Sequence, residues 1–268
     1  MIPTLSQVCS LHSSFAQDLE DYAAGGCRSI EVWLTKLEEH LKRHTLDDVR
    51  RLVEQHGVAL PVASFQGGLL ASQGEQRREH WEHFTQRLDL CRELGIGTLV
   101  VACDVPEPLS QQTLDHVSAS LTQLAQEAGR RGLRVALEFQ RSAAFGNNLQ
   151  TAAALVAETA SPHLGLCLDV FHYYTGPSKL EDLGYLNAKN LFHVQVCDVA
   201  GVPRELATDS DRILPGDGDF QWPPIIEHLQ RIDYRGPVSV ELMNPQIWQV
   251  PARQFGEIAM TSLRKLLS

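Results

Sequence analysis

Short apolar runs recur along the chain, and the segments between them carry apolar residues at helical spacing. The runs are rich in leucine and β-branched residues rather than strictly alternating, which is typical of strands covered on both faces. The pattern predicts strands at residues 5–9, 29–34, 59–65, 98–103, 134–139, 164–169, 191–196 and 238–242.

The helical segments have recognisable starts and stops. Residues 46–56 are the clearest case, because Thr45 is a good N-cap and Gly57 can adopt the left-handed conformation that ends a helix. Gly95 and Gly132 are expected to stop two further helices just before the next strand.

Repeated strand–helix units with short connections predict a closed parallel barrel, the α/β fold called a (β/α)8 or TIM barrel, as a single domain over residues 1–268. An open doubly wound sheet is the alternative, but it usually carries a glycine-rich phosphate loop after its first strand. Residues 9–15, CSLHSSF, contain no such loop. The longest irregular stretch, residues 197–222, is expected to be functional because long loops in compact domains usually are.

Composition and net charge argue against some classes of binding partner. A net charge of −10 disfavours binding to nucleic acid, and no apolar stretch approaches the length of a membrane span. The N-terminus lacks the basic start and apolar centre of a signal peptide. The six cysteines form no CxxC pair, so we expect reduced thiols and a cytoplasmic protein.

Four of the later runs end in a polar residue: Glu138, Asp169, Gln195 and Glu241. A charge at the end of a buried strand is costly unless it is paired or bound to a metal. Each residue alone would more often be a helix cap or an ion-pair partner, but four in successive strands indicate a single metal site. Oxygen ligands suit Mg²⁺ or Mn²⁺ best, while Zn²⁺ or Co²⁺ is also compatible.

Histidines accompany this set. His172 follows Asp169 by three residues and is expected to contact a substrate oxygen or, alternatively, to orient a ligand. His193 lies one layer deeper in its strand and is expected to be a core residue. Glu31, inside the second strand, could pair with a histidine or with Lys36.

Further residues are candidates for substrate contacts. Arg212, in the long loop, is a candidate donor to a substrate oxygen or carboxylate; the alternative is an arginine that ties the loop to its own aspartates. Trp33, Lys36 and Phe65 follow the second and third strands and could supply an apolar wall and polar contacts.

Several motifs together resemble a known family. They are LEF at 137–139, LDVFH at 168–172, HVQVCD at 193–198, TDSDRILPGDGDF at 208–220 and VELMNP at 240–245. The combination resembles the sugar isomerase/epimerase superfamily with a xylose isomerase-like barrel, across essentially the whole chain. The last two motifs look most like inosose (2-keto-myo-inositol) isomerases. LDxxH and the paired glutamates are shared with ketose 3-epimerases, hydroxypyruvate isomerases and 3-dehydroshikimate dehydratases.

The resemblance implies a ligand set. Glu138, Asp169 and Glu241 match the family's carboxylate ligands, and His172 matches its substrate-contacting histidine. Gln195 stands where the ketose 3-epimerases and inosose isomerases have a histidine, and here the chain resembles hydroxypyruvate isomerases and bacterial dehydroshikimate dehydratases instead. A neutral oxygen in place of a nitrogen shifts the preference toward Mg²⁺ or Mn²⁺.

The resemblance also implies an activity. One divalent metal would bind a keto-sugar or cyclitol, and Glu138 and Glu241 would move a proton through a metal-stabilised enediolate, giving an isomerase or epimerase. Loss of a β-hydroxyl at the same site would make a 3-dehydroshikimate dehydratase, the main alternative. An apurinic endonuclease and a non-catalytic sugar-binding barrel are remote alternatives. The expected partner is a small molecule, without nucleic acid or membrane, and a homodimer is the assembly considered.

Overall fold

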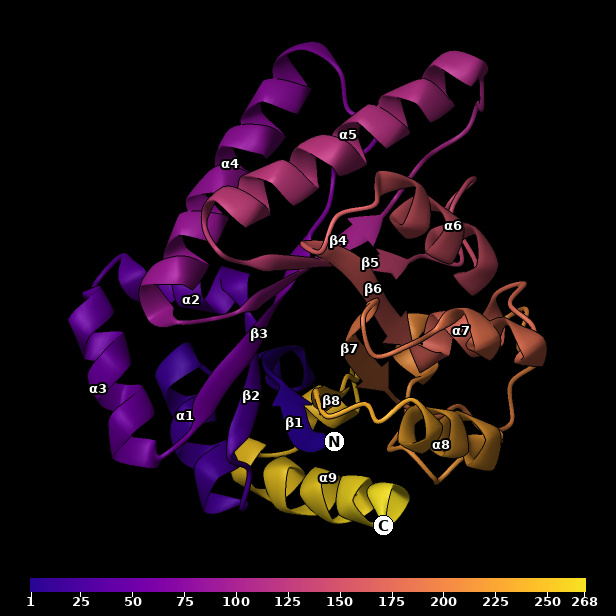
Figure 1. The fold of residues 1–268 in the computed structure, drawn as a ribbon. Helices are drawn as coiled ribbons and strands as arrows, with labels where there is room; N and C mark the ends of the chain where they lie inside the picture. Colours follow the sequence, from indigo (N-terminus) through magenta and orange to yellow (C-terminus); the bar gives the residue numbers. More distant parts are fainter.

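Eight parallel strands close into a barrel with helices around it in the computed structural model, which describes residues 1–268 (Figure 1). The strands are β1 (Ile2–Ser6), β2 (Ser29–Trp33), β3 (Ala59–Gln66), β4 (Thr98–Cys103), β5 (Arg134–Phe139), β6 (Leu164–Asp169), β7 (Leu191–Val196) and β8 (Pro237–Val240). Each strand pairs with the next one in sequence, and β8 pairs with β1. The predicted TIM barrel is confirmed.

The connections are mostly helical. The α-helices are α1 (Phe15–Ala24), α2 (Leu34–Leu41), α3 (Leu46–His56), α4 (Gly74–Leu94), α5 (Gln111–Arg130), α6 (Leu149–Thr159), α7 (Val170–Thr175), α8 (Trp222–Arg231) and α9 (Ala252–Leu267). Short 3-10 turns lie at Gln7–Ser10, Leu180–Tyr185, Asp209–Asp211 and Ile247–Gln249. No helix combines the length and the apolar character that crossing a bilayer requires.

The predicted helix ends are largely correct. Thr45 and Asp48 form a reciprocal capping box at the start of α3, and Gly57 ends it with φ of 60°. Gly95 ends α4 with φ of 72°. Helix α5 already ends at Arg130, so Gly132, with φ of 70°, shapes the turn to β5 rather than the helix end itself.

The first strand is the clearest correction. The sequence predicts residues 5–9, but β1 is Ile2–Ser6 and the next residues form a 3-10 turn. Cys9 lies outside the sheet but is buried against the end of β8. Its thiol donates to the Val240 carbonyl and accepts the Leu242 amide. The apolar run therefore extends past the strand, since burial continues where strand pairing does not.

Most buried apolar side chains form one core between the barrel and its helices. A small separate cluster takes one residue from each of β3 to β7: Val62, Val100, Ala136, Cys167 and Phe192. Ala136 and Cys167 lie two residues before Glu138 and Asp169, so in each strand the two side chains lie on the same face. These residues form an apolar floor beneath the strand ends.

Candidate metal centre

The four polar strand ends meet at one rim of the barrel. Glu138 lies in β5, Asp169 ends β6, Gln195 lies in β7, and Glu241 directly follows β8. These strands are consecutive neighbours in the barrel, and the four residues are only 5, 0, 1 and 7% exposed, respectively. The carboxyl ends of parallel strands are where barrel enzymes hold their sites.

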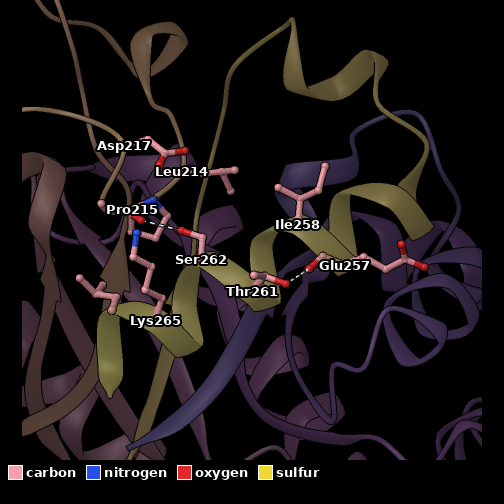
Figure 2. Close-up of a pocket in the computed structure, with 10 residues that line it drawn as sticks. Leu214, Pro215, Asp217, Glu257, Ile258, Thr261, Ser262 and Lys265 are labelled. Carbon is pink, nitrogen blue, oxygen red and sulfur yellow. Dashed lines mark hydrogen bonds between the residues drawn. The ribbon is translucent and has the colours of Figure 1, made fainter.

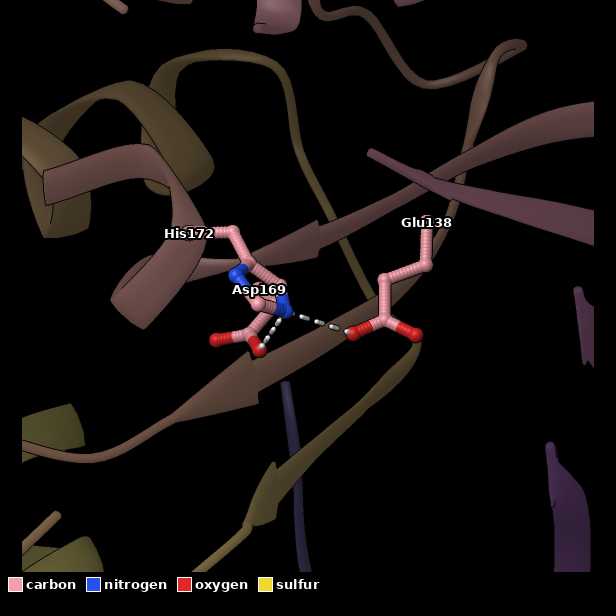
Figure 3. A group of neighbouring side chains, drawn as sticks. All are labelled: Glu138, Asp169 and His172. Carbon is pink, nitrogen blue, oxygen red and sulfur yellow. Dashed lines mark ion pairs between the residues drawn. The ribbon is translucent and has the colours of Figure 1, made fainter. Parts of the chain in front are cut away.

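Three of the side chains form a compact group that could hold a cation (Figure 3). The Nε2 atom of His172 lies 3.6 Å from an oxygen of Glu138 and 3.6 Å from an oxygen of Asp169. Potential ligand atoms of the three lie within 4.8 Å of one another. His172 Nδ1 is buried and has no hydrogen-bond partner, so the ring is held by packing rather than by a second bond.

Asp169 serves two purposes at once. One oxygen accepts the backbone amide of Phe171, 2.8 Å away, and so caps α7. Its other oxygen faces His172 and the guanidinium of Arg212, 2.8 Å from Nη2. Asp169 is therefore a helix cap, and its second oxygen is still directed at the group of candidate ligands.

Arg212 is buried in the centre of the group. Its guanidinium bonds Asp169, Glu241 and Asp209, with Glu241 at 3.1 Å and Asp209 at 2.8 Å. The predicted tie to an aspartate of its own loop is present, and two of the strand-end carboxylates share the same group. The guanidinium also stacks over the ring of Phe171, 4.3 Å from its centroid.

The amide of Gln195 links the site to a deeper layer. Its Nε2 donates to Glu241 and to Glu31, each at 2.9 Å, and its Oε1 accepts the thiol of Cys167 at 3.1 Å. Glu31 in turn bonds His193 Nε2 at 3.0 Å. Of the two partners considered for Glu31, the histidine is correct, and His193 is a core residue as predicted.

Burial and neighbouring charges together shift the pKa values of Glu138, Asp169, His172 and Glu241. Burial, reinforced by the charge of Asp169, raises the pKa of Glu138 well above its usual range. Burial also raises the pKa of Glu241, although Arg212 opposes the shift. Burial would raise the pKa of Asp169 too, but Arg212 and His172 together outweigh it and hold it low. Burial lowers the pKa of His172.

This charge balance fits a divalent cation. Glu138, Asp169 and Glu241 are three buried carboxylates, and Arg212, which pairs with Asp169 and Glu241, is the one buried guanidinium among them, so full ionisation leaves two excess negative charges in a buried space. Such an excess is unfavourable without a counterion. The Glu138 carboxylate accepts no hydrogen bond, which leaves its oxygens free for a ligand. An all-oxygen set with a nearby histidine suits Mg²⁺, Mn²⁺ or Zn²⁺.

The predicted substrate contacts from the early strands lie in other surroundings. The Lys36 ammonium forms a buried ion pair with Asp18 at 2.7 Å and also contacts Ser10, which follows β1. Trp33 lines a groove with Lys36 and His40. Phe65, near the end of β3, is 50% exposed and free to contact a ligand.

A groove of about 580 Å³ lies elsewhere, between the loop after β7 and α9 (Figure 2). Leu214, Asp217, Glu257, Ile258 and Lys265 line part of its walls, and Ser262 donates to the carbonyl of Pro215 across it. None of the strand-end residues reaches it. The groove therefore lacks the paired carboxylates on which the predicted chemistry depends.

Asp198 is a functional residue that the sequence pattern does not reveal. Its buried carboxylate accepts the backbone amides of Val199, Gly216 and Phe220, each at 3.0 Å, and the indole of Trp222 at 2.8 Å. It thereby folds the long loop that carries Arg212. An acidic residue three positions after Gln195 is the only sequence signal of this role.

A family model described as "Xylose isomerase-like TIM barrel" matches residues 19–266. The chain belongs to this family. The xylose isomerase-like assignment agrees with the closed barrel and with the rim on which the four strand ends meet.

Similar proteins of the xylose isomerase-like family include enzymes of two classes. An inosose isomerase of Bacillus velezensis is 28% identical over 262 residues, which cover 96% of this chain and 93% of that protein. A 3-dehydroshikimate dehydratase of Pseudomonas aeruginosa is 28% identical over 96% of this chain but only 40% of its own length. The crystal structure of an IolI protein with a bound zinc atom superimposes with a TM-score of 0.93 at 26% identity, covering 100% and 98% of the two chains.

Proposed function

We propose that the protein is a divalent-metal-dependent isomerase or epimerase of a keto-sugar or inosose. The observation that carries this proposal is the pair of buried glutamates, Glu138 and Glu241, brought to one rim from β5 and β8. Similarity to inosose isomerases over nearly the full length supports it.

Glu138, Asp169, Gln195 and Glu241 would hold the metal, with His172 beside it. The Gln195 amide oxygen now accepts the Cys167 thiol and its nitrogen donates to Glu241, so the amide would have to turn and give up these bonds to present its oxygen to the ion. A divalent cation bound there would polarise a substrate carbonyl and make the neighbouring C–H bond more acidic. The similar IolI structure holds a zinc atom, which supports metal binding by this chain, and Mn²⁺, Mg²⁺, Co²⁺ and Zn²⁺ all need testing.

The protein residues would divide the proton transfer between two faces of the substrate. One glutamate removes the proton next to the carbonyl, and the other returns a proton to the opposite face or to the adjacent carbon. In the metal-free protein burial raises the pKa of Glu138 and of Glu241 above the ordinary carboxyl range, so each carboxyl group can hold a proton as well as release one. His172 and Arg212 would bind substrate oxygens and stabilise the developing negative charge.

Deuterium exchange tests the proposal. Metal-loaded protein is incubated in D₂O with 2-keto-myo-inositol and a panel of ketoses, and exchange at the carbon next to the carbonyl is followed by NMR. We expect exchange with at least one compound and a loss of about 100-fold or more in E138Q and E241Q. Wild type without exchange on any compound, or glutamate variants as active as wild type, would refute it.

A 3-dehydroshikimate dehydratase is the second candidate, favoured by Gln195 and by similarity to the Pseudomonas enzymes. The same glutamates would remove the proton, and one would donate a proton to the departing hydroxyl. Formation of protocatechuate from 3-dehydroshikimate, measured by absorbance, decides between the two candidates. Trp33, Lys36 and Phe65 as substrate contacts, a homodimer and a cytoplasmic location remain predictions.

A further inference from the structure

A polar pocket lies on the side of the barrel where the strands end, and we call it the rim pocket. It is an open depression of about 410 Å³ among the loops that follow β5, α7 and β7. Its side chains are polar or charged except for one proline: Arg141, Ser142, Thr175, Pro177, Arg204 and Glu205. A pocket of this composition is suited to a charged ligand rather than to an apolar one.

Its two guanidinium groups are held in place by the backbone. Arg141 Nη1 donates to the carbonyl of Arg204, and Arg204 Nη2 donates to the carbonyl of Gly176, each at 3.1 Å. Each bond uses one nitrogen and leaves other N–H groups free for a ligand. Arg141 forms no ion pair, and the single carboxylate near Arg204 is that of the exposed Glu205, at 3.6 Å. In a chain of net charge −10, this pocket is locally positive.

The rim pocket adjoins the candidate metal centre. Arg141 lies three residues after Glu138, and its guanidinium stands 5.7 Å from the ring centroid of Phe171, the same ring that Arg212 covers. The amide of Gly176 donates to the carbonyl of His172 at 3.1 Å. The charge of Arg141 also acts on His172, where it helps to lower the pKa.

We propose that the rim pocket binds the anionic group of the substrate, a carboxylate or a phosphate, while the carbonyl end reacts between Glu138 and Glu241. Two arginines with free N–H groups match the oxygens of such an anion. The inference rests on the proposed function for the reacting end, but it does not depend on whether the reaction is isomerisation or dehydration. It makes an acidic keto compound a better substrate than a neutral inosose.

Calorimetric titration of Mn²⁺-loaded protein tests the inference with three probes: 3-dehydroshikimate, neutral 2-keto-myo-inositol and inorganic phosphate. We expect R141Q and R204Q to weaken binding of the carboxylate about tenfold or more, and to leave binding of the neutral inosose unchanged. R235Q is the matched control, because it removes an exposed arginine outside the pocket. Equal Mn²⁺ affinity and circular dichroism of all variants establish that they are folded.

The probes also distinguish the two sources of the anion. Arginine-dependent binding of phosphate without binding of 3-dehydroshikimate assigns the pocket to a phosphorylated substrate. Unchanged anion binding in the R141Q/R204Q double variant, equal losses for neutral and anionic probes, or no anion binding by wild type overturns the inference. Arginine-dependent binding without any exchange or turnover leaves the inference standing and refutes only the proposed function.

Discussion

At the scale of single residues, the unusual feature of the site is its excess of buried acid. Glu138, Asp169 and Glu241 have only Arg212 as a buried cationic partner, and Glu31 lies directly beneath them. Because ionising all of them is unfavourable without a counterion, protons replace the metal in the metal-free protein. Metal binding must therefore displace protons.

Metal affinity should consequently rise with pH. The pKa values of Glu138 and Glu241 are raised, so these groups keep protons above the usual carboxyl range, and every displaced proton favours the metal complex as pH increases. We expect roughly tenfold tighter Mn²⁺ binding per pH unit for each proton displaced. Titration calorimetry at pH 6 and pH 8, in buffers of different ionisation enthalpy, measures both affinity and proton release. A pH-independent affinity would contradict this account.

Glu31 should matter although it reaches the metal only through Gln195. E31Q removes the buried charge that His193 and Gln195 both bond, and we expect a loss of about 3 kcal/mol in the free energy of unfolding, measured by urea denaturation. Metal affinity should fall 10- to 100-fold because the amide is no longer oriented. E227Q, on the exposed face of α8, is the control and should change stability by less than about 0.5 kcal/mol.

Sequence alone could identify the strand ends but not their partners. Each of Glu138, Asp169, Gln195 and Glu241 closes a local apolar run, and so it is visible in a short window. The bond between Glu31 and His193 joins residues 162 positions apart, and no local pattern encodes it. Lys36, a predicted substrate contact, pairs with Asp18, and local sequence spacing does not reveal that partner either.

At the scale of elements, the loop between β7 and α8 is the decisive one. It has only one 3-10 turn, and its shape depends on Asp198, whose carboxylate collects four N–H donors from residues 199–222. Arg212 occupies its place between two carboxylates because this loop is folded. The sequence predicted a long functional loop here, but not the residue that organises it.

D198A should release this loop. Losing a buried charged acceptor leaves several donors without partners, and we expect a decrease of about 3 kcal/mol or more in the free energy of unfolding. Limited proteolysis should then cut within residues 197–221. D219A is the matched control from the same loop, because that exposed aspartate accepts only the Gly201 amide, at 3.3 Å. Equal protease resistance in the two variants would be inconsistent with this role.

Strand positions were predictable wherever an apolar run and a strand coincide. The bounds of β4, β5, β6 and β7 agree with the prediction, because in these four segments the apolar run and the paired strand residues coincide. β1 is displaced by three residues, since Val8 and Cys9 are buried by tertiary contacts rather than by sheet pairing. A run of residues can therefore be apolar because tertiary contacts bury it, whether or not it pairs in the sheet.

At the scale of the whole molecule, the barrel depends on pairing its first and last strands. β1 pairs with β8 from Ile2 to Leu5, and α9 then packs against β1 and α1, which brings the two ends of the chain near one another (Figure 1). The repeated strand–helix periodicity made this architecture predictable, because few other folds bury eight strands on both faces.

Metal should stabilise this closed barrel as a whole. A ligand bound only by the native state at 100 times its Kd adds about 2.7 kcal/mol to stability, since the four strand ends come together only when the barrel is folded. Calorimetry with Mn²⁺ and with EDTA should therefore differ by roughly 5 °C in Tm. D169N should lose most of this difference. A Tm of wild type that is indifferent to metal would argue against a native metal centre.

Barrel closure also sets the timing of site assembly during synthesis. Every strand-end residue of the site belongs to the second half of the chain, and Glu241 follows the last strand. Chains fold from the N-terminus as they emerge from the ribosome, so a nascent chain carries Glu138 and Asp169 long before it gains Glu241 and the β8 edge that closes the barrel. Metal binding by the finished site is accordingly a late event. A chain that stops short of β8 has acidic strand ends and an open sheet edge, and such a chain is suited to removal by cellular quality control.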